Sequence, residues 1–380
     1  MNTDEEEKRR GRKFVPSAKF TDFETFTRAK FSISLPFLPH QSRIGGMPAI
    51  GLTTLPPELI IQILREAISE YDPLQPLPRQ ELQSTLLPLA RLSRSFQHPA
   101  QALLHRTLGF SDAVTGRDFL DSEMGGEFVT ETLLLYGAGL IESTGITAGT
   151  AERIIRKTNG LRYLRLAFIG KLEEGILGLP QLADLTTLEL MTAILPSPSP
   201  VVLPNRLTSL SLSTWKSPPL FVPTLLRASA STLRSLSISL SSSTPDLPEI
   251  LTAFQLIAPN LTALDLTNLS ALPAEFPPLL TLCRSLISLK HLTGSRIEEI
   301  HTLLSSLPPS SHLRKLSSKI FVRDMSAAAI SRLDDCLELD SMRGLRKWDF
   351  AYSGEVVVGT DVGGFYGRCK ERGIEVVFGY

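Results

Sequence analysis

Leucine recurs in a fixed pattern along the C-terminal part of this 380-residue chain. The six-residue pattern Leu-x-x-Leu-x-Leu begins at eight positions, and apolar side chains fill 22 of its 24 slots. Successive starts lie 24, 22, 26, 28, 25, 27 and 32 residues apart. The starts are Leu161, Leu185, Leu207, Leu233, Leu261, Leu286, Leu313 and Leu345. The pattern predicts a short strand at each position, within a unit repeated roughly every 20–29 residues, a period that every interval but the last fits.

The segments between these strands predict the other half of each unit. Three of them space their apolar residues as one face of a helix: Ile250, Leu251, Phe254 and Ile257; Ile297, Ile300, Leu304 and Leu307; and Ile330, Leu333 and Leu337. Residues 191–250 hold nine prolines, so we expect extended or 3₁₀ connections in place of helices there. We expect right-handed βα coils, a further unit at Thr130–Leu135 and a closing strand at Ile374–Phe378. One unit buries too little apolar surface to offset its chain entropy, so the units must stack.

Residues 55–110 show helical spacing in place of the leucine repeat. Pro56-Pro57 and Glu58 suit the first turn of a helix. Its apolar stripe is Leu59, Ile60, Ile63, Leu64, Ala67 and Ile68. A second run holds Leu82, Leu86, Leu89, Leu92 and Phe96, and Pro99 is expected to restart a third helix with Leu103, Leu104 and Leu108. Three short helices make little core alone, which predicts packing against a partner or against the repeats.

Charge and cysteine content restrict the function classes. The chain has 39 basic and 39 acidic residues, so no net field favours nucleic acid or an anionic membrane. Three dispersed cysteines predict neither a disulfide framework nor a CxxC metal site. No apolar run reaches the roughly 20 residues of a membrane span, and no signal peptide is recognisable, which favours a cytoplasmic or nuclear location. Residues 1–50 are expected to be a disordered tail, whose basic cluster at 8–13 is either a nuclear-import signal or a solvated segment.

Signatures of catalysis and of cofactor binding are missing from the sequence. No phosphate-binding loop, H-E-x-x-H zinc motif or G-x-S-x-G nucleophile motif occurs. Gly137 and Gly139 only partly resemble a dinucleotide loop, and His98 and His105 lack a third ligand nearby in sequence. The acids at 334, 335, 338 and 340 are interpreted as the solvated face of a helix, with a cation site as the alternative. We therefore expect a non-enzymatic protein without cofactor or metal.

The predicted strands offer a surface for a partner. Residues that flank the central leucine of each hexapeptide point away from the core, onto a concave face on the order of 35 Å long. The candidate partner-binding residues are Tyr163, Arg165, Glu189, Ser211, Ser237, Asp265, Lys290, Lys315 and Lys347. The middle of this face is rich in serine and its ends are charged. A protein or peptide seated centrally and anchored by charge at both ends would fit, and a merely soluble sheet face is the alternative.

The hexapeptides and their period resemble leucine-rich repeats, although the asparagine that normally follows the strand is largely missing. Residues 51–110 resemble an F-box: Leu55, Pro56, Glu58, Leu59, Ile63 and Leu64 match its opening pattern. Leu92-Ser93-Arg94-Ser95-Phe96 matches its second half, with Phe96 where tryptophan is usual and a proline-rich insert at Asp72–Arg79. Together they resemble the F-box/leucine-rich-repeat family, including fungal members, over about residues 52–380.

This resemblance implies an α/β fold, in which a small three-helix F-box-like module (51–110) precedes an irregular leucine-rich-repeat solenoid with parallel strands (111–380). It also implies a substrate receptor of a cullin–RING, SCF-type, ubiquitin ligase. The Skp adaptor would bind Leu55, Pro56, Leu59, Ile63 and Leu64, and a target protein would bind the concave face. The alternatives are a repeat scaffold without a ubiquitin role, in which the helices cap the array, and an enzyme whose site is assembled from distant residues.

Overall fold

The computed structural model describes residues 56–67, 86, 88–89, 94–122, 128–137, 145–172, 175–194, 206–213, 220–239, 244, 246–266, 273–291, 297–321, 327–353 and 362–379. The chain divides into two units, Met1–Gly51 and Leu52–Tyr380, and every described residue belongs to the second. The expected tail at 1–50, with its basic cluster, therefore lies outside the described residues.

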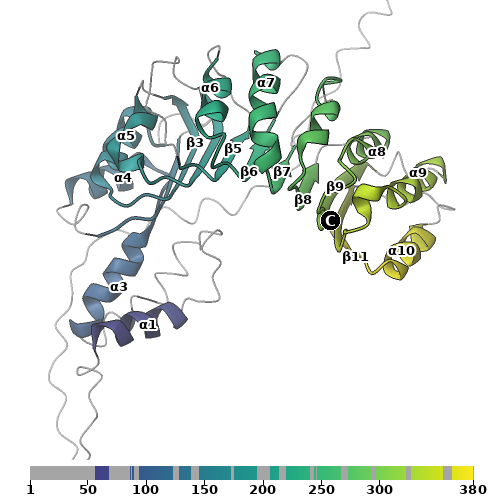
Figure 1. Cartoon of the computed structure of the whole chain (residues 1–380). Helices are drawn as coiled ribbons and strands as arrows, with labels where there is room; N and C mark the ends of the chain where they lie inside the picture. Colours follow the sequence, from purple (N-terminus) through teal and green to yellow (C-terminus); the bar gives the residue numbers. More distant parts are fainter. Residues whose placement is uncertain are drawn as a thin grey trace, which may run out of the picture. The chain divides into compact units, whose positions relative to one another are not determined.

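One sheet of eleven parallel strands, paired in the order of the sequence, organises this second unit (Figure 1). The sheet is open, because β1 and β11 stand at the two ends of the strand order. The strands are β1 Thr107–Phe110, β2 Thr132–Tyr136, β3 Tyr163–Lys171, β4 Thr187–Ile194, β5 Ser209–Ser213, β6 Ser235–Ile238, β7 Ala263–Asp265, β8 Ser288–His291, β9 Lys315–Phe321, β10 Lys347–Ser353 and β11 Glu375–Gly379. The expected α/β class with neighbouring parallel strands is thus confirmed.

The strands fall where the leucine pattern places them. Strands β3 to β10 each begin two residues after the leading leucine of a hexapeptide, as β3 does at Tyr163 after Leu161. The expected extra unit at Thr130–Leu135 corresponds to β2, and the expected closing strand corresponds to β11. Strand β1 extends the array one step further than the sequence predicted, pairing Leu108 with Leu133.

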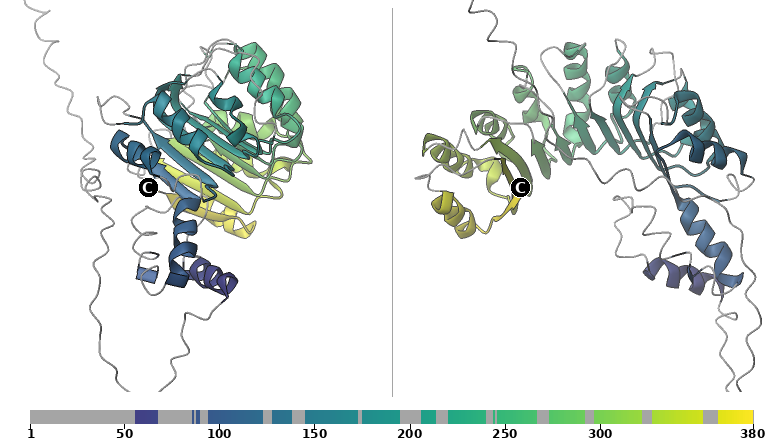
Figure 2. Two further views of the ribbon diagram at one scale, coloured as in Figure 1. Left: turned by 90° about the vertical axis from the view of Figure 1, so that its left-hand side faces the viewer. Right: turned by 180° about the vertical axis from the view of Figure 1, so that it is seen from behind.

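Helices connect the strands and cover one face of the sheet (Figures 1 and 2). The α-helices of the array are α4 Ala113–Asp121, α5 Ala148–Lys157, α6 Phe221–Ala228, α7 Leu247–Ile257, α8 Ile297–Ser305, α9 Ala327–Leu337 and α10 Val362–Glu371. The 3₁₀ helices are η5 Ile176–Gly178, η6 Pro180–Leu182, η7 Ala258–Asn260, η8 Pro277–Leu282 and η10 Asp340–Met342.

Helix α6 corrects the expectation that prolines exclude helices from residues 191–250. Pro223 is the third residue of α6, where the missing N–H has no partner within the helix to lose. Phe221, Val222, Leu225 and Leu226 are all buried on the core side of this helix. Their burial offsets the weak intrinsic helix propensity of a short, proline-containing segment.

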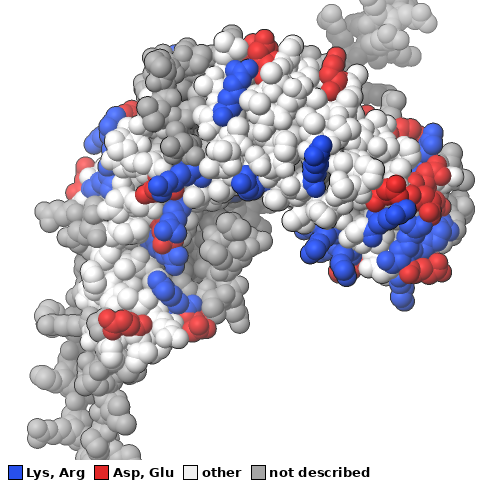
Figure 3. All heavy atoms as spheres, viewed as in Figure 1, with Lys and Arg blue, Asp and Glu red and all other residues white. Residues whose placement is uncertain are grey.

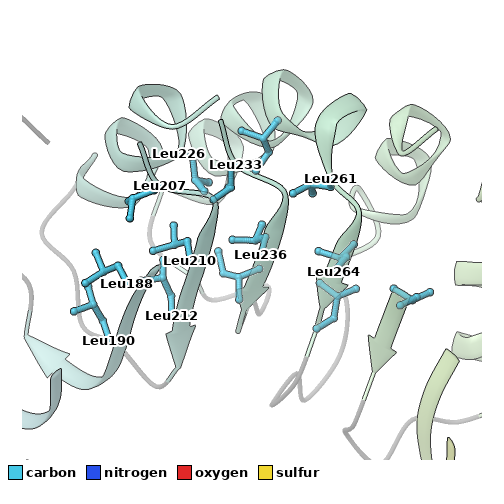
Figure 4. Packing of buried hydrophobic residues seen from close by; sticks show 14 of the residues in the cluster. Leu188, Leu190, Leu207, Leu210, Leu212, Leu226, Leu233, Leu236, Leu261 and Leu264 are labelled. Atoms are coloured by element: carbon cyan, nitrogen blue, oxygen red, sulfur yellow. The ribbon is translucent and has the colours of Figure 1, made fainter. Parts of the chain in front are cut away.

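The core fills the layer between the sheet and these helices. The hexapeptide leucines, among them Leu188, Leu210, Leu236 and Leu264, point from successive strands into one continuous apolar cluster (Figure 4). Each internal unit is covered by its neighbours on both sides, which a single unit could not achieve alone. Three fully buried cysteines, Cys283, Cys336 and Cys369, belong to the same cluster.

Ser318 breaks the leucine pattern for a structural reason. Its side chain is fully buried in β9, and its Oγ accepts a hydrogen bond of 2.9 Å from the indole Nε1 of Trp348 on β10. Trp348 occupies the central leucine slot of the last hexapeptide and is also fully buried. A buried indole N–H requires an acceptor, and the serine supplies it.

Two helices whose bounds the structure describes precede the sheet and share a separate small core, to which the helical residue Leu86 also belongs. They are α1 Pro57–Ala67 and α3 Arg94–Arg106. The core residues are Ile60, Leu64, Leu86, Phe96, Ala100 and Leu103. The first predicted helix is therefore confirmed.

The expected restart at Pro99 is wrong. Helix α3 runs through this residue without interruption, because Phe96, Ala100 and Leu103 bury one continuous face on both sides of it. Leu108, expected in the third helix, lies in β1, where alternate residues are buried and pair with β2.

Candidate functional site

Helix α1 carries an exposed apolar pair on its surface. The side chains of Leu59 and Ile63 are 46% and 43% exposed, and residues four apart share one face of a helix. Pro56 is exposed just before them, whereas Leu55 lies outside the described residues. Large apolar side chains that remain exposed next to a completed core favour contact with another protein.

Leu64 was also predicted to contact an adaptor, but it is fully buried in the small core of α1 and α3. One residue further along a helix turns the side chain by about 100°, which separates Leu64 from Ile63. The candidate surface of α1 is therefore the pair Leu59 and Ile63, and Leu64 belongs to the core that holds the helix in place.

The predicted partner-binding residues form two rows across the strands, on the face of the sheet that points away from the helices. We term this surface the open face. The first row holds Tyr163, Thr187, Ser209, Ser235, Ala263, Ser288, Lys315 and Lys347. The second row holds Arg165, Glu189, Ser211, Ser237, Asp265, Lys290, Ser317 and Asp349. Register thus brings together side chains that are scattered over nearly 190 residues of sequence.

A block of four serines occupies the middle of the open face. Ser209 and Ser211 on β5 lie in register with Ser235 and Ser237 on β6. All four are partly buried, and their hydroxyls make no hydrogen bond within the described part of the chain. A hydroxyl both donates and accepts, so this block can bind the backbone of an extended segment.

At the β3–β4 end of the open face, Arg165 is held by its neighbours. Its Nε donates to Oε2 of Glu189 at 2.5 Å, and its Nη1 donates to the Tyr136 hydroxyl at 3.3 Å. Its guanidinium also lies 5.9 Å from the ring centre of Tyr163. Burial lowers the pKa of Arg165, but these hydrogen bonds outweigh it and the pKa lies above its ordinary value.

Tyr163 differs from the expectation because its side chain is buried, at 9% exposure, although it lies on the open face. Its hydroxyl has no hydrogen-bond partner among the described residues. Burial, together with the nearby carboxylate of Glu189, raises the pKa of this phenol, which therefore stays neutral.

At the β8–β10 end, the lysines are more exposed than Arg165, and two of them share one carboxylate. Lys290 pairs with Asp265 at 3.2 Å, and Asp349 pairs with both Lys315 at 3.4 Å and Lys347 at 3.3 Å. Lys315 and Lys347 are in register on adjacent strands, so two cations lie side by side with one carboxylate between them.

Two residues at this end were not among the predicted site residues. Arg314 and Arg346 directly precede β9 and β10, and both are exposed without an ion-pair partner within the described ranges. The signal was present as Leu313-Arg314-Lys315 and Leu345-Arg346-Lys347. It was missed because only the residues flanking each central leucine were considered.

The four acids of the alternative cation site pair with arginines. Figure 3 shows acidic and basic side chains intermingled over the helices at the C-terminal end of the array. Asp334 accepts two hydrogen bonds from Arg368, each of 2.7 Å. Asp335, Glu338 and Asp340 pair in turn with Arg332, Arg372 and Arg343. Within the described ranges, no cluster of three or more His, Cys, Asp or Glu side chains is arranged to hold a metal ion.

The remaining sequence candidates have structural explanations. Gly137 sits so close to β3 that a Cβ atom would lie 1.9 Å from the carbonyl oxygen of Phe168. His98 and His105 both contact the ring of Phe128, at 5.1 and 4.8 Å between centroids. Burial raises the pKa of Cys283 and Cys336 to about 12 and that of Cys369 to about 11, which makes these thiols poor nucleophiles.

In the part of the chain that the structure describes, no helix combines the length and apolar character required to cross a membrane. Comparison with protein-family models finds no match, and comparison with curated proteins likewise finds none.

Proposed function

We propose that this chain is the substrate-recognition subunit of a cullin–RING, SCF-type, ubiquitin ligase. In this proposal the α1–α3 module is an F-box that binds the Skp adaptor, and the sheet is an irregular leucine-rich-repeat solenoid that binds a target protein. The subunit performs no bond chemistry, because its contribution is to hold a target close to the transferase.

The exposed pair Leu59 and Ile63 is the observation that carries this proposal. The module keeps Ile60 and Leu64 for its own core and leaves two large apolar side chains in contact with water. Such exposure costs free energy in a monomer, and a partner that covers the pair recovers it. The F-box resemblance, carried by Pro56, Glu58 and Leu59, names the adaptor as that partner.

The open face supports the second half of the proposal. Its strands present small hydroxyls in the middle and charge at both ends, with Arg165 and Glu189 at one end and Lys290, Lys315 and Lys347 at the other. An extended or folded target can contact several strands at once, since adjacent strands lie roughly 4.8 Å apart.

Capture of the Skp adaptor tests the proposal. Wild-type chain is expected to retain purified adaptor at micromolar concentration, and Leu59→Asp with Ile63→Asp is expected to lose binding by more than about tenfold because two central apolar contacts become charged. Leu256→Asp is the matched control, since Leu256 is 55% exposed on α7, outside the α1–α3 module. Circular dichroism must show that all variants remain folded.

The second candidate function is a leucine-rich-repeat scaffold that binds proteins without a role in ubiquitination. The serine block and the charged ends of the open face favour it as much as they favour a target receptor, because both functions need a binding surface. If the wild-type chain fails to capture the adaptor, the ubiquitin-ligase proposal is refuted and the scaffold function remains. If the α1 variants unfold while the Leu256→Asp chain does not, the helices serve as a cap of the array.

A further inference from the structure

The β8–β10 end of the open face, together with the residues that directly precede its strands, holds more positive charge than the neighbouring carboxylates neutralise. Its cations are Lys290, Arg314, Lys315, Arg346 and Lys347, and the carboxylates on the same strands or on those beside them are Asp265, Asp349 and Glu375. Among the residues whose side chains the structure describes here, five cations against three carboxylates leave a net charge of +2. We term these five cations the basic corner.

The arrangement of the basic corner is unfavourable without a ligand. Register sets Arg314-Lys315 beside Arg346-Lys347, and the backbone N–H of Arg346 donates to the carbonyl of Arg314 at 2.9 Å. Like charges on neighbouring strands destabilise a sheet. Asp349 reduces the repulsion between Lys315 and Lys347 by pairing with both. Neither Arg314 nor Arg346 has an ion-pair partner among the described residues.

The two ends of the open face differ in the partners of their cations. Arg165 on β3 donates hydrogen bonds to Glu189 and Tyr136. Among the described residues, Arg162, Arg314 and Arg346, which directly precede β3, β9 and β10, have no ion-pair partner, and Arg314 and Arg346 precede adjacent strands. An arginine guanidinium binds a carboxylate through two parallel hydrogen bonds, so two such groups at one corner match two carboxylates of a single segment.

We propose that the basic corner binds an acidic segment of the target protein, rich in Asp and Glu, that lies in an extended conformation across β8 to β10. Side chains on one side of an extended segment repeat about every 6.8 Å, a spacing that the long side chains of Arg314 and Arg346 span on neighbouring strands. Ser288 and Ser317 lie in the adjoining positions of the two rows, and their hydroxyls have no hydrogen-bond partner among the described residues, so they can bond the segment's backbone.

Nucleic acid fits this corner less well. Asp265 and Asp349 are interleaved with the lysines, and a phosphate backbone carries its charge continuously, so it would meet repulsion at these carboxylates. A peptide can place its carboxylates only where the arginines are. This inference names the chemistry of the target in the proposed function, but its test does not require the adaptor.

The test measures binding of a labelled twelve-residue peptide rich in Glu and Asp to the full chain, by fluorescence anisotropy. A peptide with Gln and Asn in place of the acids is the first control. We expect the acidic peptide alone to bind, and Arg314→Glu with Arg346→Glu to weaken it by about tenfold or more. The matched charge control is Arg153→Glu with Arg227→Glu, on α5 and α6, which should change binding less than about twofold.

Three results would overturn the inference: equal binding of the two peptides, equal binding by wild type and the Arg314/Arg346 variant, or tighter binding of a single-stranded RNA of equal length. Adaptor capture by the same Arg314/Arg346 variant should remain at the wild-type level. A chain that captures adaptor but not the acidic peptide refutes the basic corner alone, and the reverse result refutes only the adaptor role.

Discussion

The two ends of the open face carry similar residues in different states. At β3–β4, Arg165 and Glu189 are 24% and 22% exposed and bond each other at 2.5 Å. At β9–β10, Lys315 is 51% exposed and shares Asp349 with Lys347 at distances above 3 Å. The first arrangement is a half-buried network that links three strands through Tyr136, whereas the second joins two more exposed lysines to the half-buried Asp349 over longer distances.

This difference distinguishes charged side chains that stabilise the fold from charged side chains that can bind a ligand. A half-buried ion pair with good geometry loses much when one partner is removed, because the other charge stays behind unpaired. Exposed pairs between flexible side chains contribute little. We therefore assign the β3–β4 charges to the stability of the sheet and the β9–β10 charges to a ligand.

The largest effect is expected from Gly137→Ala, at the end of β2. The new Cβ would meet the carbonyl oxygen of Phe168, and backbone on both sides must move to admit it. We expect the free energy of unfolding to fall by at least about 3 kcal/mol, measured by urea denaturation.

Gly149→Ala is the control for this substitution. Gly149 lies in α5 with nothing within 4 Å of an added Cβ, so alanine should stabilise the helix by about 0.5–1 kcal/mol. If Gly137→Ala is as harmless as Gly149→Ala, the β2–β3 end of the sheet is not tightly packed, and the contrast between the two ends fails.

The second effect tests the contrast directly with a pair of equivalent substitutions. Arg165→Met removes the partner of Glu189 and is expected to cost about 2 kcal/mol. Lys315→Met removes an exposed charge and should cost less than about 0.5 kcal/mol. Both values come from denaturant unfolding at neutral pH. Equal costs for the two variants would show that the two ends do not differ in the way proposed.

The smallest of the three effects concerns the core beneath the β9–β10 end. Ser318→Ala removes the acceptor of the buried Trp348 indole N–H and is expected to cost about 1–2 kcal/mol. Ser317→Ala, one residue earlier and on the open face, should stay within about 0.5 kcal/mol of wild type. A neutral Ser318→Ala chain would mean that Trp348 finds another acceptor.

The strands were predictable because local sequence determines them. The leucine-type positions whose side chains the structure describes are buried in every hexapeptide, so a strand two residues after Leu161 or Leu345 follows from the pattern alone. Strand β1 was not predictable in this way. Leu103, Leu104 and Leu108 share a helical spacing, and only pairing with β2 makes residues 107–110 extended.

The site was predictable only in part, since its decisive features depend on contacts across the sheet. Sequence placed Arg165 and Lys315 on the same face but did not show that Arg165 pairs closely with Glu189, whereas Lys315 shares Asp349 with Lys347 at longer distances. It also could not divide the stripe of α1 into Leu64, which is buried, and Ile63, which is not. Both distinctions require knowledge of which neighbours cover each side chain.

The reactivity of the three buried cysteines can report local opening in the C-terminal part of the array. A thiol whose pKa is raised to about 11 or 12 is almost entirely protonated at neutral pH and reacts slowly while it is covered. Cys283 precedes β8, Cys336 lies in α9 and Cys369 in α10, so each marks a different coil. Because each coil rests only on its neighbours, the rates at which a thiol reagent labels these positions would rank how readily successive coils open from the β11 end.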